Sequence, residues 1–210
     1  STLRAGVMDD LKRSAGETEI NAMGQKLAAS LAAGAIGFST GLYYKTATAA
    51  KMEEVIALAK VLAKGGGIYT THMRDEADHI MDSLQETKTT AEEANVPVVV
   101  SHHKCAQPRN WGRSNETLAF IEETRGSIAM GLDAYPYAAG STVLDPDWAH
   151  DDIRIMITTS APYPGAKGRD LSDIAEEWNS SLKEAAVKLP PAGAIYFQID
   201  EGDMQRILAY

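Results

Sequence analysis

The fold of this chain is decided by Pro97-Val98-Val99-Val100-Ser101, which His102 follows directly. Three consecutive valines between turn-forming neighbours are typical of a strand that is buried on both faces, as in parallel sheets. Similar apolar segments begin at Ile36, Ile68 and Ile128. Strand starts therefore recur about every 30 residues, which is the length of one βα unit. This alternation predicts an α/β fold with a parallel sheet covered by helices.

Helical segments separate these strands, and Gly34 shows how one of them ends. Residues 18–33 have apolar side chains at helical spacing, and Gly34 follows as a typical C-terminal stop. The expected helices are 18–33, 52–62, 75–94, 114–126, 171–182 and one still in progress at 204–210. The expected strands are 35–40, 68–72, 97–101, 128–133 and 194–199.

Residues 140–191 break this rhythm. They contain five of the eight prolines of the chain and only one clear helix. We therefore expect an insertion after the fourth strand. The predicted division is 1–139 for the βα units of the sheet, 140–191 for the insertion, and 192–210 for a further strand of the same sheet and the start of a helix.

Composition excludes several classes of protein. The chain has 210 residues, of which 44% are hydrophobic and 23% charged, as expected for a globular protein with a sizeable core. A net charge of −9 argues against nucleic-acid binding, which needs a basic surface. No apolar run reaches the roughly 20 residues of a membrane span. A single cysteine excludes an internal disulfide and predicts a cytoplasmic protein.

Common catalytic motifs are absent or out of context. Gly34-Ala35-Ile36-Gly37 follows a helix and opens a strand, the reverse of a dinucleotide-binding turn, and no phosphate-binding loop motif occurs. The run His72 to Glu76 is not a zincin motif, because it follows a strand. Cys105 has no positioned base beside it in sequence, and we expect it to be inert. Solvated surface positions are expected for His79, His150 and the acidic segment 75–93.

Polar residues close three successive strands. His72 ends the second strand, His102 the third, and Asp133 with Tyr135 the fourth. In parallel α/β folds the carboxyl ends of the strands form the site. The two histidines could therefore converge on one metal ion, since imidazole is a common zinc ligand. The alternative is that each histidine is a hydrogen-bonded strand-end residue without a metal, and the pattern alone leaves both interpretations open.

Two stretches carry a resemblance to a known family: Tyr69-Thr70-Thr71-His72-Met73-Arg74 and Ser101-His102-His103-Lys104. With them the chain resembles the N-acyl-D-amino-acid deacylases (D-aminoacylases), which are metal-dependent TIM-barrel hydrolases of the amidohydrolase superfamily. Supporting segments are 2–8, 34–41, 110–114 and 133–137. The resemblance covers essentially the whole chain. Ser101–Lys104 and 192–197 lean toward the N-acyl-D-glutamate deacylase branch.

The resemblance implies a fold, an activity and a site. The fold would be part of a TIM (β/α)8 barrel of amidohydrolase type with an insertion late in the barrel. The activity would be zinc-dependent hydrolysis of N-acyl-D-amino acids, with a small-molecule substrate as the partner. His72 and His102 would be zinc ligands, and Lys104 and Tyr135 would hold the substrate carboxylate. Residues two apart on an extended strand end share a face, so His102 and Lys104 should point together and His103 away.

The family pattern is incomplete within these 210 residues. The resemblance implies a His-x-His pair and a metal-bridging cysteine upstream, and a general-base aspartate downstream. No catalytic residue is therefore expected within the chain, which we expect to be a portion of a longer enzyme and inactive alone. Two alternatives stay open. One is another amidohydrolase of the dihydroorotase or dipeptidase type, and the other is a non-catalytic, degenerate barrel module.

Overall fold

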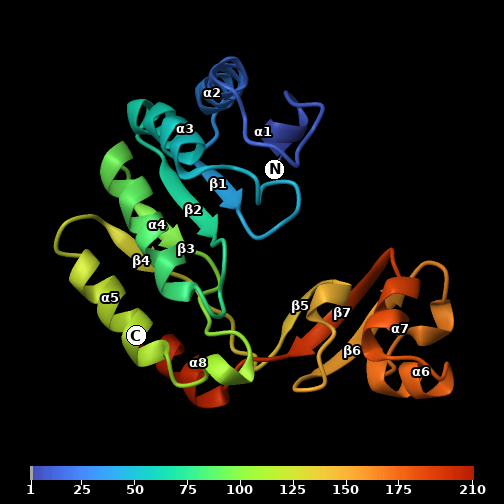
Figure 1. Cartoon of the computed structure of the whole chain (residues 1–210). Coiled ribbons are helices and arrows are strands. Elements are labelled where there is room, and N and C mark those ends of the chain that lie inside the picture. Colours follow the sequence, from blue (N-terminus) through green and yellow to red (C-terminus); the bar gives the residue numbers. More distant parts are fainter. Residues whose placement is uncertain (1) are drawn as a thin grey trace. The chain divides into compact units, whose positions relative to one another are not determined.

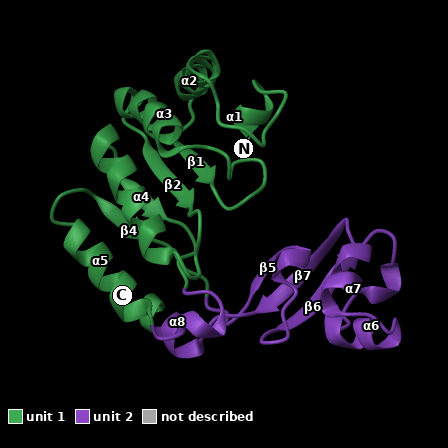
Figure 2. Cartoon of the chain, viewed as in Figure 1, with its two compact units in different colours: residues 1–104, 113–135, 206–210 green, residues 105–112, 136–205 purple. Residues whose placement is uncertain are grey.

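The computed structural model describes residues 2–210 and divides them into two units (Figure 2). Unit 1 comprises residues up to 104 together with 113–135 and 206–210, and unit 2 comprises 105–112 and 136–205. Each unit contains a sheet of its own. The predicted insertion 140–191 lies inside unit 2, while the predicted boundaries after residues 139 and 191 stay a prediction.

Unit 1 is built on a four-stranded parallel sheet in the order β1-β2-β3-β4. Its strands are β1 (Gly37–Gly41), β2 (Ile68–His72), β3 (Val98–Val100) and β4 (Met130–Leu132). Val98 and Val100 are fully buried, as the valine run predicts. The prediction of an α/β fold with a parallel sheet is confirmed. Because all four strands run in one direction, their carboxyl ends meet at one edge.

One helix connects each pair of neighbouring strands in this sheet (Figure 1). The helices of unit 1 are α1 (Thr2–Ala5), α2 (Glu17–Ala32), α3 (Met52–Gly65), α4 (Ile80–Ala94) and α5 (Ser114–Thr124). Helix α3 packs its buried Leu58 against Met23 and Leu27 of α2. Helices α3 and α4 both end at a left-handed residue, Gly66 and Asn95, which stops further helical hydrogen bonding.

Unit 2 is built on a three-stranded antiparallel sheet in the order β5-β7-β6. Its strands are β5 (Gly140–Val143), β6 (Arg154–Ser160) and β7 (Ala192–Phe197). The helices α6 (Leu171–Glu177) and α7 (Leu182–Lys188) pack on it, and a buried core of its own includes Ile157, Ile174 and Leu189. Short 3-10 turns are η1 (Pro108–Asn110), η2 (Pro146–Trp148) and η3 (Pro164–Ala166), and the last helix of the chain is α8 (Glu201–Leu208).

Three sequence predictions of secondary structure are wrong in detail. The strand near 194–199 does not extend the parallel sheet, because β7 pairs antiparallel with β5 and β6. The helix predicted at 171–182 is two helices, because Asn179 is left-handed and Ser181 caps a new start. The helix predicted at 75–94 begins only at Ile80. The Asp75 carboxylate accepts from the backbone amides of Ala77 and His79 and so competes with helix formation.

None of the helices within residues 2–210 is both long enough and apolar enough to cross a bilayer.

Candidate metal centre

The carboxyl ends of β2 and β3 bring two histidines together. His72 is the last residue of β2, and His102 lies two residues beyond the end of β3. The centroids of their imidazole rings are 4.5 Å apart. Both side chains are partly buried, with 17% and 30% of their surface exposed. The sequence expectation that strand-end histidines meet at one place agrees with this geometry.

A turn held by Asp133 aims His102 into the site. His102 has a left-handed backbone with φ of 43°, which is uncommon for a residue other than glycine. The Asp133 carboxylate supports this turn by accepting from the His102 backbone amide at 2.6 Å and from the Ser101 hydroxyl at 3.2 Å. The His103 backbone amide in turn donates to the Asp133 carbonyl at 2.8 Å.

This turn changes the reason why His102 and Lys104 face the same way. The sequence argument of an extended strand end is wrong, because β3 stops at Val100 and the backbone at His102 is not extended. The two side chains nevertheless meet, with Lys104 Nζ 2.9 Å from His102 Nδ1. His103 points away, as predicted, and its buried ring contacts the Thr117 hydroxyl at 2.8 Å.

Lys104 and Tyr135 lie on the same side of the cluster. The Lys104 side chain is 7% exposed, and its ammonium lies 5.5 Å from the centroid of the Tyr135 ring. The Tyr135 ring is also 6.4 Å from that of His102. Burial first, and then the negative charge of Glu76, raises the pKa of Tyr135, so its phenol stays protonated and can donate a hydrogen bond.

Glu76 is the site residue that the sequence reasoning missed. Its side chain is 11% exposed, and Oε2 accepts from Lys104 Nζ at 2.7 Å. Oε1 is 3.0 Å from His102 Nδ1, and Oε2 is 3.7 Å from His72 Nε2. The sequence places Glu76 on an outer helix face. It belongs instead to the loop 73–79 after β2. The signal in the sequence was Asp75, whose carboxylate accepts from the backbone amides of Ala77 and His79 and so delays the start of the helix.

The loop 73–79 is fixed on both sides of Glu76. The Arg74 guanidinium donates to both carboxylate oxygens of Glu86 on α4, at 2.8 and 2.9 Å, and to the carbonyls of Thr48 and Ala50. The Asp75 carboxylate accepts from the Ala77 backbone amide at 2.6 Å. Glu76 is therefore presented by a backbone whose neighbours are anchored to other elements.

The charges in the cluster balance one another. Burial raises the pKa of Glu76, but the Lys104 ammonium and the two neighbouring imidazoles outweigh it and bring this pKa to about 2. Burial lowers the pKa of His72 to about 4, against a smaller opposing effect of the Glu76 carboxylate. At neutral pH the cluster therefore contains an ionised Glu76 and a neutral His72 whose imidazole can bind a cation.

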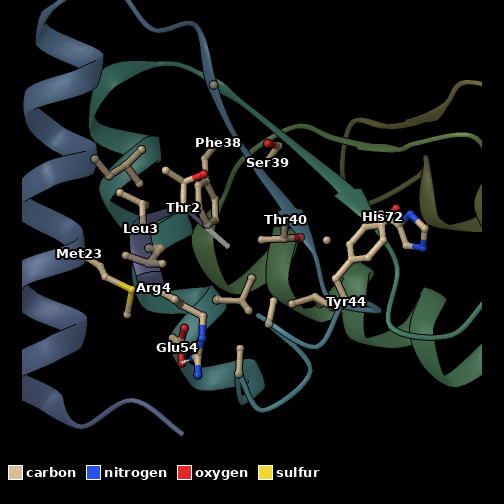
Figure 3. A pocket seen from close by; sticks show the side chains of 18 of the residues that line it. Thr2, Leu3, Arg4, Met23, Phe38, Ser39, Thr40, Tyr44, Glu54 and His72 are labelled. Carbon is tan, nitrogen blue, oxygen red and sulfur yellow. Dashed lines mark hydrogen bonds and ion pairs between the residues drawn. The ribbon is translucent and has the colours of Figure 1, made fainter. Parts of the chain in front are cut away.

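A cavity of about 500 Å³ extends from this cluster along β1. His72 and Tyr44 line one part of it, and the buried ion pair of Arg4 and Glu54 lines another (Figure 3). The volume is in the range of small-molecule sites. His72 and His102 thus face a space that can hold a small substrate.

The donor set of the cluster fits a zinc ion. Donor atoms of His72, Glu76 and His102 all lie within 4.8 Å of one another, and the Glu76 carboxylate places a negative charge beside both imidazoles, with Oε1 3.0 Å from His102 Nδ1. Imidazole nitrogen is an ordinary zinc ligand, and a carboxylate beside ligand histidines is a common supporting group of such sites. Among the described residues, no other group of three such side chains comes this close together.

The remaining histidines and the cysteine lie outside this cluster. Cys105 is buried and in no disulfide, His150 is exposed, and His79 is exposed and contacts Asp82 of the following helix α4 at 3.2 Å. These positions agree with the sequence interpretation of His79 and His150 as surface residues.

Comparison with known proteins identifies three similar sequences from Alcaligenes xylosoxydans xylosoxydans. The chain is 49% identical over 210 residues to a D-aminoacylase, 44% over 211 residues to an N-acyl-D-aspartate deacylase and 41% over 211 residues to an N-acyl-D-glutamate deacylase. Each match covers 100% of this chain but only 43%, 42% and 43% of the respective relative, so the chain spans less than half the length of these proteins. No family model matches the chain.

Solved structures give the same result. A crystal structure of D-aminoacylase, described as defining a novel subset of amidohydrolases, matches with 51% identity and a TM-score of 0.95 over 99% of this chain and 44% of that one. A second D-aminoacylase structure, 50% identical, concerns a binuclear metal center. An N-acyl-D-glutamate deacylase from Bordetella bronchiseptica, complexed with zinc and a phosphonate inhibitor, matches with 42% identity and a TM-score of 0.96 over the same shares. These identities do not single out the glutamate branch.

Proposed function

Because the chain is a homologue of the D-aminoacylase family, we propose that it carries the strand ends that bind metal and substrate in a zinc-dependent N-acyl-D-amino-acid deacylase. The observation that carries this proposal is the partly buried cluster of His72, Glu76, His102 and Lys104 at the carboxyl ends of β2 and β3. Hydrolysis of the amide bond would give a carboxylate and a D-amino acid.

The proposal extends to the fold. The four parallel strands of unit 1 would be part of a (β/α)8 barrel of amidohydrolase type, in which strand carboxyl ends form the active site. Unit 2 would contain the insertion of that barrel. Support comes from the match over 99% of this chain to a structure described as an amidohydrolase.

The site residues expected from the sequence would have two kinds of role, metal binding and substrate binding. When bound, zinc would lower the pKa of a coordinated water toward ~7 and polarise the amide carbonyl. His72 and His102 would hold the zinc through neutral imidazoles. Lys104 and Tyr135 would hold the free carboxylate of the substrate through an ammonium and a phenol, and so place the scissile amide at the metal. We assign no general base within the chain, since the family resemblance implies an aspartate outside it.

The metal site within these residues has fewer protein ligands than a catalytic zinc usually has. A catalytic zinc usually keeps three protein ligands, and we assign two, His72 and His102. We therefore propose that hydrolysis requires metal ligands beyond these 210 residues. The 210-residue chain alone, given excess zinc, should not turn over N-acyl-D-amino acids, and robust turnover by it would refute this part of the proposal.

A substrate panel tests the proposed activity. The protein expressed from its whole reading frame and loaded with zinc should hydrolyse N-acetyl-D-leucine, N-acetyl-D-glutamate or N-acetyl-D-aspartate but not the matching L-compounds. Release of the amino acid is measured with and without a chelator, which should abolish it. Hydrolysis of dihydroorotate or of dipeptides instead would favour the other amidohydrolases, and zinc binding without any turnover would favour a non-catalytic barrel.

A further inference from the structure

The Lys104 side chain has many rotatable bonds, yet its proposed role requires its ammonium to stay in one place. A lysine has a four-carbon stem and a compact ammonium with three donors, so it does not fix its own geometry. Within residues 2–210, this ammonium has two polar contacts at hydrogen-bonding distance, Glu76 Oε2 at 2.7 Å and His102 Nδ1 at 2.9 Å. One N–H donor then remains for a ligand. Glu76 is the only one of these two partners that carries a balancing charge.

Glu76 is better fixed than the lysine that it contacts. Its loop is anchored by Arg74 to α4 and by Asp75 to backbone amides, and only 11% of its side chain is exposed. The short, charge-assisted bond to Lys104 is of the strong type. The rigid partner therefore sets the position of the flexible one.

We propose that Glu76 is a positioning residue, which holds the Lys104 ammonium where it meets the carboxylate of the substrate. This inference rests on the proposed function, because it takes Lys104 as the carboxylate-binding residue. Glu76 is not a zinc ligand in this assignment. Its Oε2 lies 2.7 Å from Lys104 Nζ but 3.7 Å from His72 Nε2. If this carboxylate turned from Lys104 to a metal ion, the buried ammonium would lose its charged partner.

The inference predicts how the two residues depend on each other. Glu76→Gln keeps the shape of the side chain but removes its charge, so the ammonium should lose its fixed place. We expect KM for the N-acetyl-D-amino acid to rise about tenfold or more, with kcat changed less than about threefold, because ground-state binding of the carboxylate is what suffers. Lys104→Met should raise KM at least as much.

The double variant gives the decisive comparison. If Glu76 acts through Lys104, then Glu76→Gln in the Lys104→Met background should change KM by less than about twofold, which is strong non-additivity for a contacting pair. All measurements use zinc-loaded protein from the whole reading frame. Glu76→Asp, which retains the charge on a shorter arm, should lie between wild type and Glu76→Gln, and it replaces Glu76→Gln in the cycle if that variant does not fold.

Lys60 and Glu93 offer a matched control. They form another Lys–Glu pair, 3.5 Å apart, but both side chains are more than half exposed. Glu93→Gln should leave KM and kcat unchanged. Additive effects of Glu76→Gln and Lys104→Met would overturn the inference while leaving the deacylase assignment intact. So would a zinc-loaded crystal structure with a Glu76 oxygen about 2.0–2.2 Å from the metal. A wild-type protein that hydrolyses no N-acyl-D-amino acid would overturn both.

Discussion

At the scale of single residues, His72 decides whether the cluster is ready for a metal at neutral pH. Only the neutral imidazole binds zinc, so protons compete with the metal. Burial lowers the pKa of His72 to about 4, whereas an ordinary histidine titrates near 6.5. The site therefore keeps this ligand deprotonated in the range where an exposed histidine would already be half protonated.

The same pKa shift makes the stability of the metal-free protein depend on pH. Between pH 6.5 and pH 4 an unfolded His72 takes up a proton that the folded one does not, so the free energy of unfolding falls as the pH falls. Glu76 adds a further loss only below its ordinary pKa of 4.5. From pH 7 to pH 5, wild type should lose about 2 kcal/mol more than His72→Asn.

Urea unfolding in the presence of a chelator, at pH 7 and pH 5, measures this difference. The matched control is His79→Asn, because the side chain of His79 is 74% exposed. From pH 7 to pH 5 this variant should lose as much stability as wild type. Equal losses in wild type and His72→Asn would contradict the pKa shift of His72.

At the scale of elements, the loop 73–79 between β2 and α4 is the part that completes the cluster. Arg74 bridges it to Glu86 on α4 and to the carbonyls of Thr48 and Ala50. Arg74 and Glu86 are 32% and 15% exposed, so solvent screens this pair only in part. The bridge is bidentate, which gives it a defined geometry as well as energy.

Removing this bridge should loosen the loop without unfolding the sheet. In Arg74→Ala, we expect the backbone amides of 75–79 to exchange with deuterium at least about tenfold faster, because opening the loop no longer breaks the bridge. Arg154→Ala, which removes an exposed pair with Asp170 in unit 2, is the control and should leave these amides unchanged. Unchanged exchange at 75–79 in Arg74→Ala would show that other contacts hold Glu76.

These elements also show what the sequence could predict. The valine run and the recurring strands were sufficient to predict the parallel sheet, and polar residues at strand ends were sufficient to place His72 and His102 at one edge. Lys104 came from the family resemblance alone, because the turn at His102 does not follow from an extended strand end. Glu76 was missed because helix-like spacing in 75–94 hid the short-range hydrogen bonds of Asp75. Such side-chain capture of backbone amides competes with a helix and leaves no trace in apolar periodicity.

At the scale of the whole molecule, two different sheets share one chain. Unit 1 has the parallel sheet that carries the cluster, and unit 2 has an antiparallel sheet with its own core. The sequence did not separate them correctly, because an apolar segment such as Ala192–Phe197 reads as a strand whichever way it pairs. Direction and partner depend on contacts distant in sequence, which local composition does not encode.

If the ends of β2 and β3 form a zinc centre, a titration with zinc should detect it. The protein from its whole reading frame is freed of metal and titrated calorimetrically, as wild type and as His72→Asn, His102→Asn and His79→Asn. We predict that His72→Asn and His102→Asn each bind zinc at least about 100-fold more weakly, since a lost ligand costs no less than a disturbed supporting residue. His79→Asn should bind as wild type. Wild-type affinity in His72→Asn and His102→Asn would contradict a zinc centre at these strand ends.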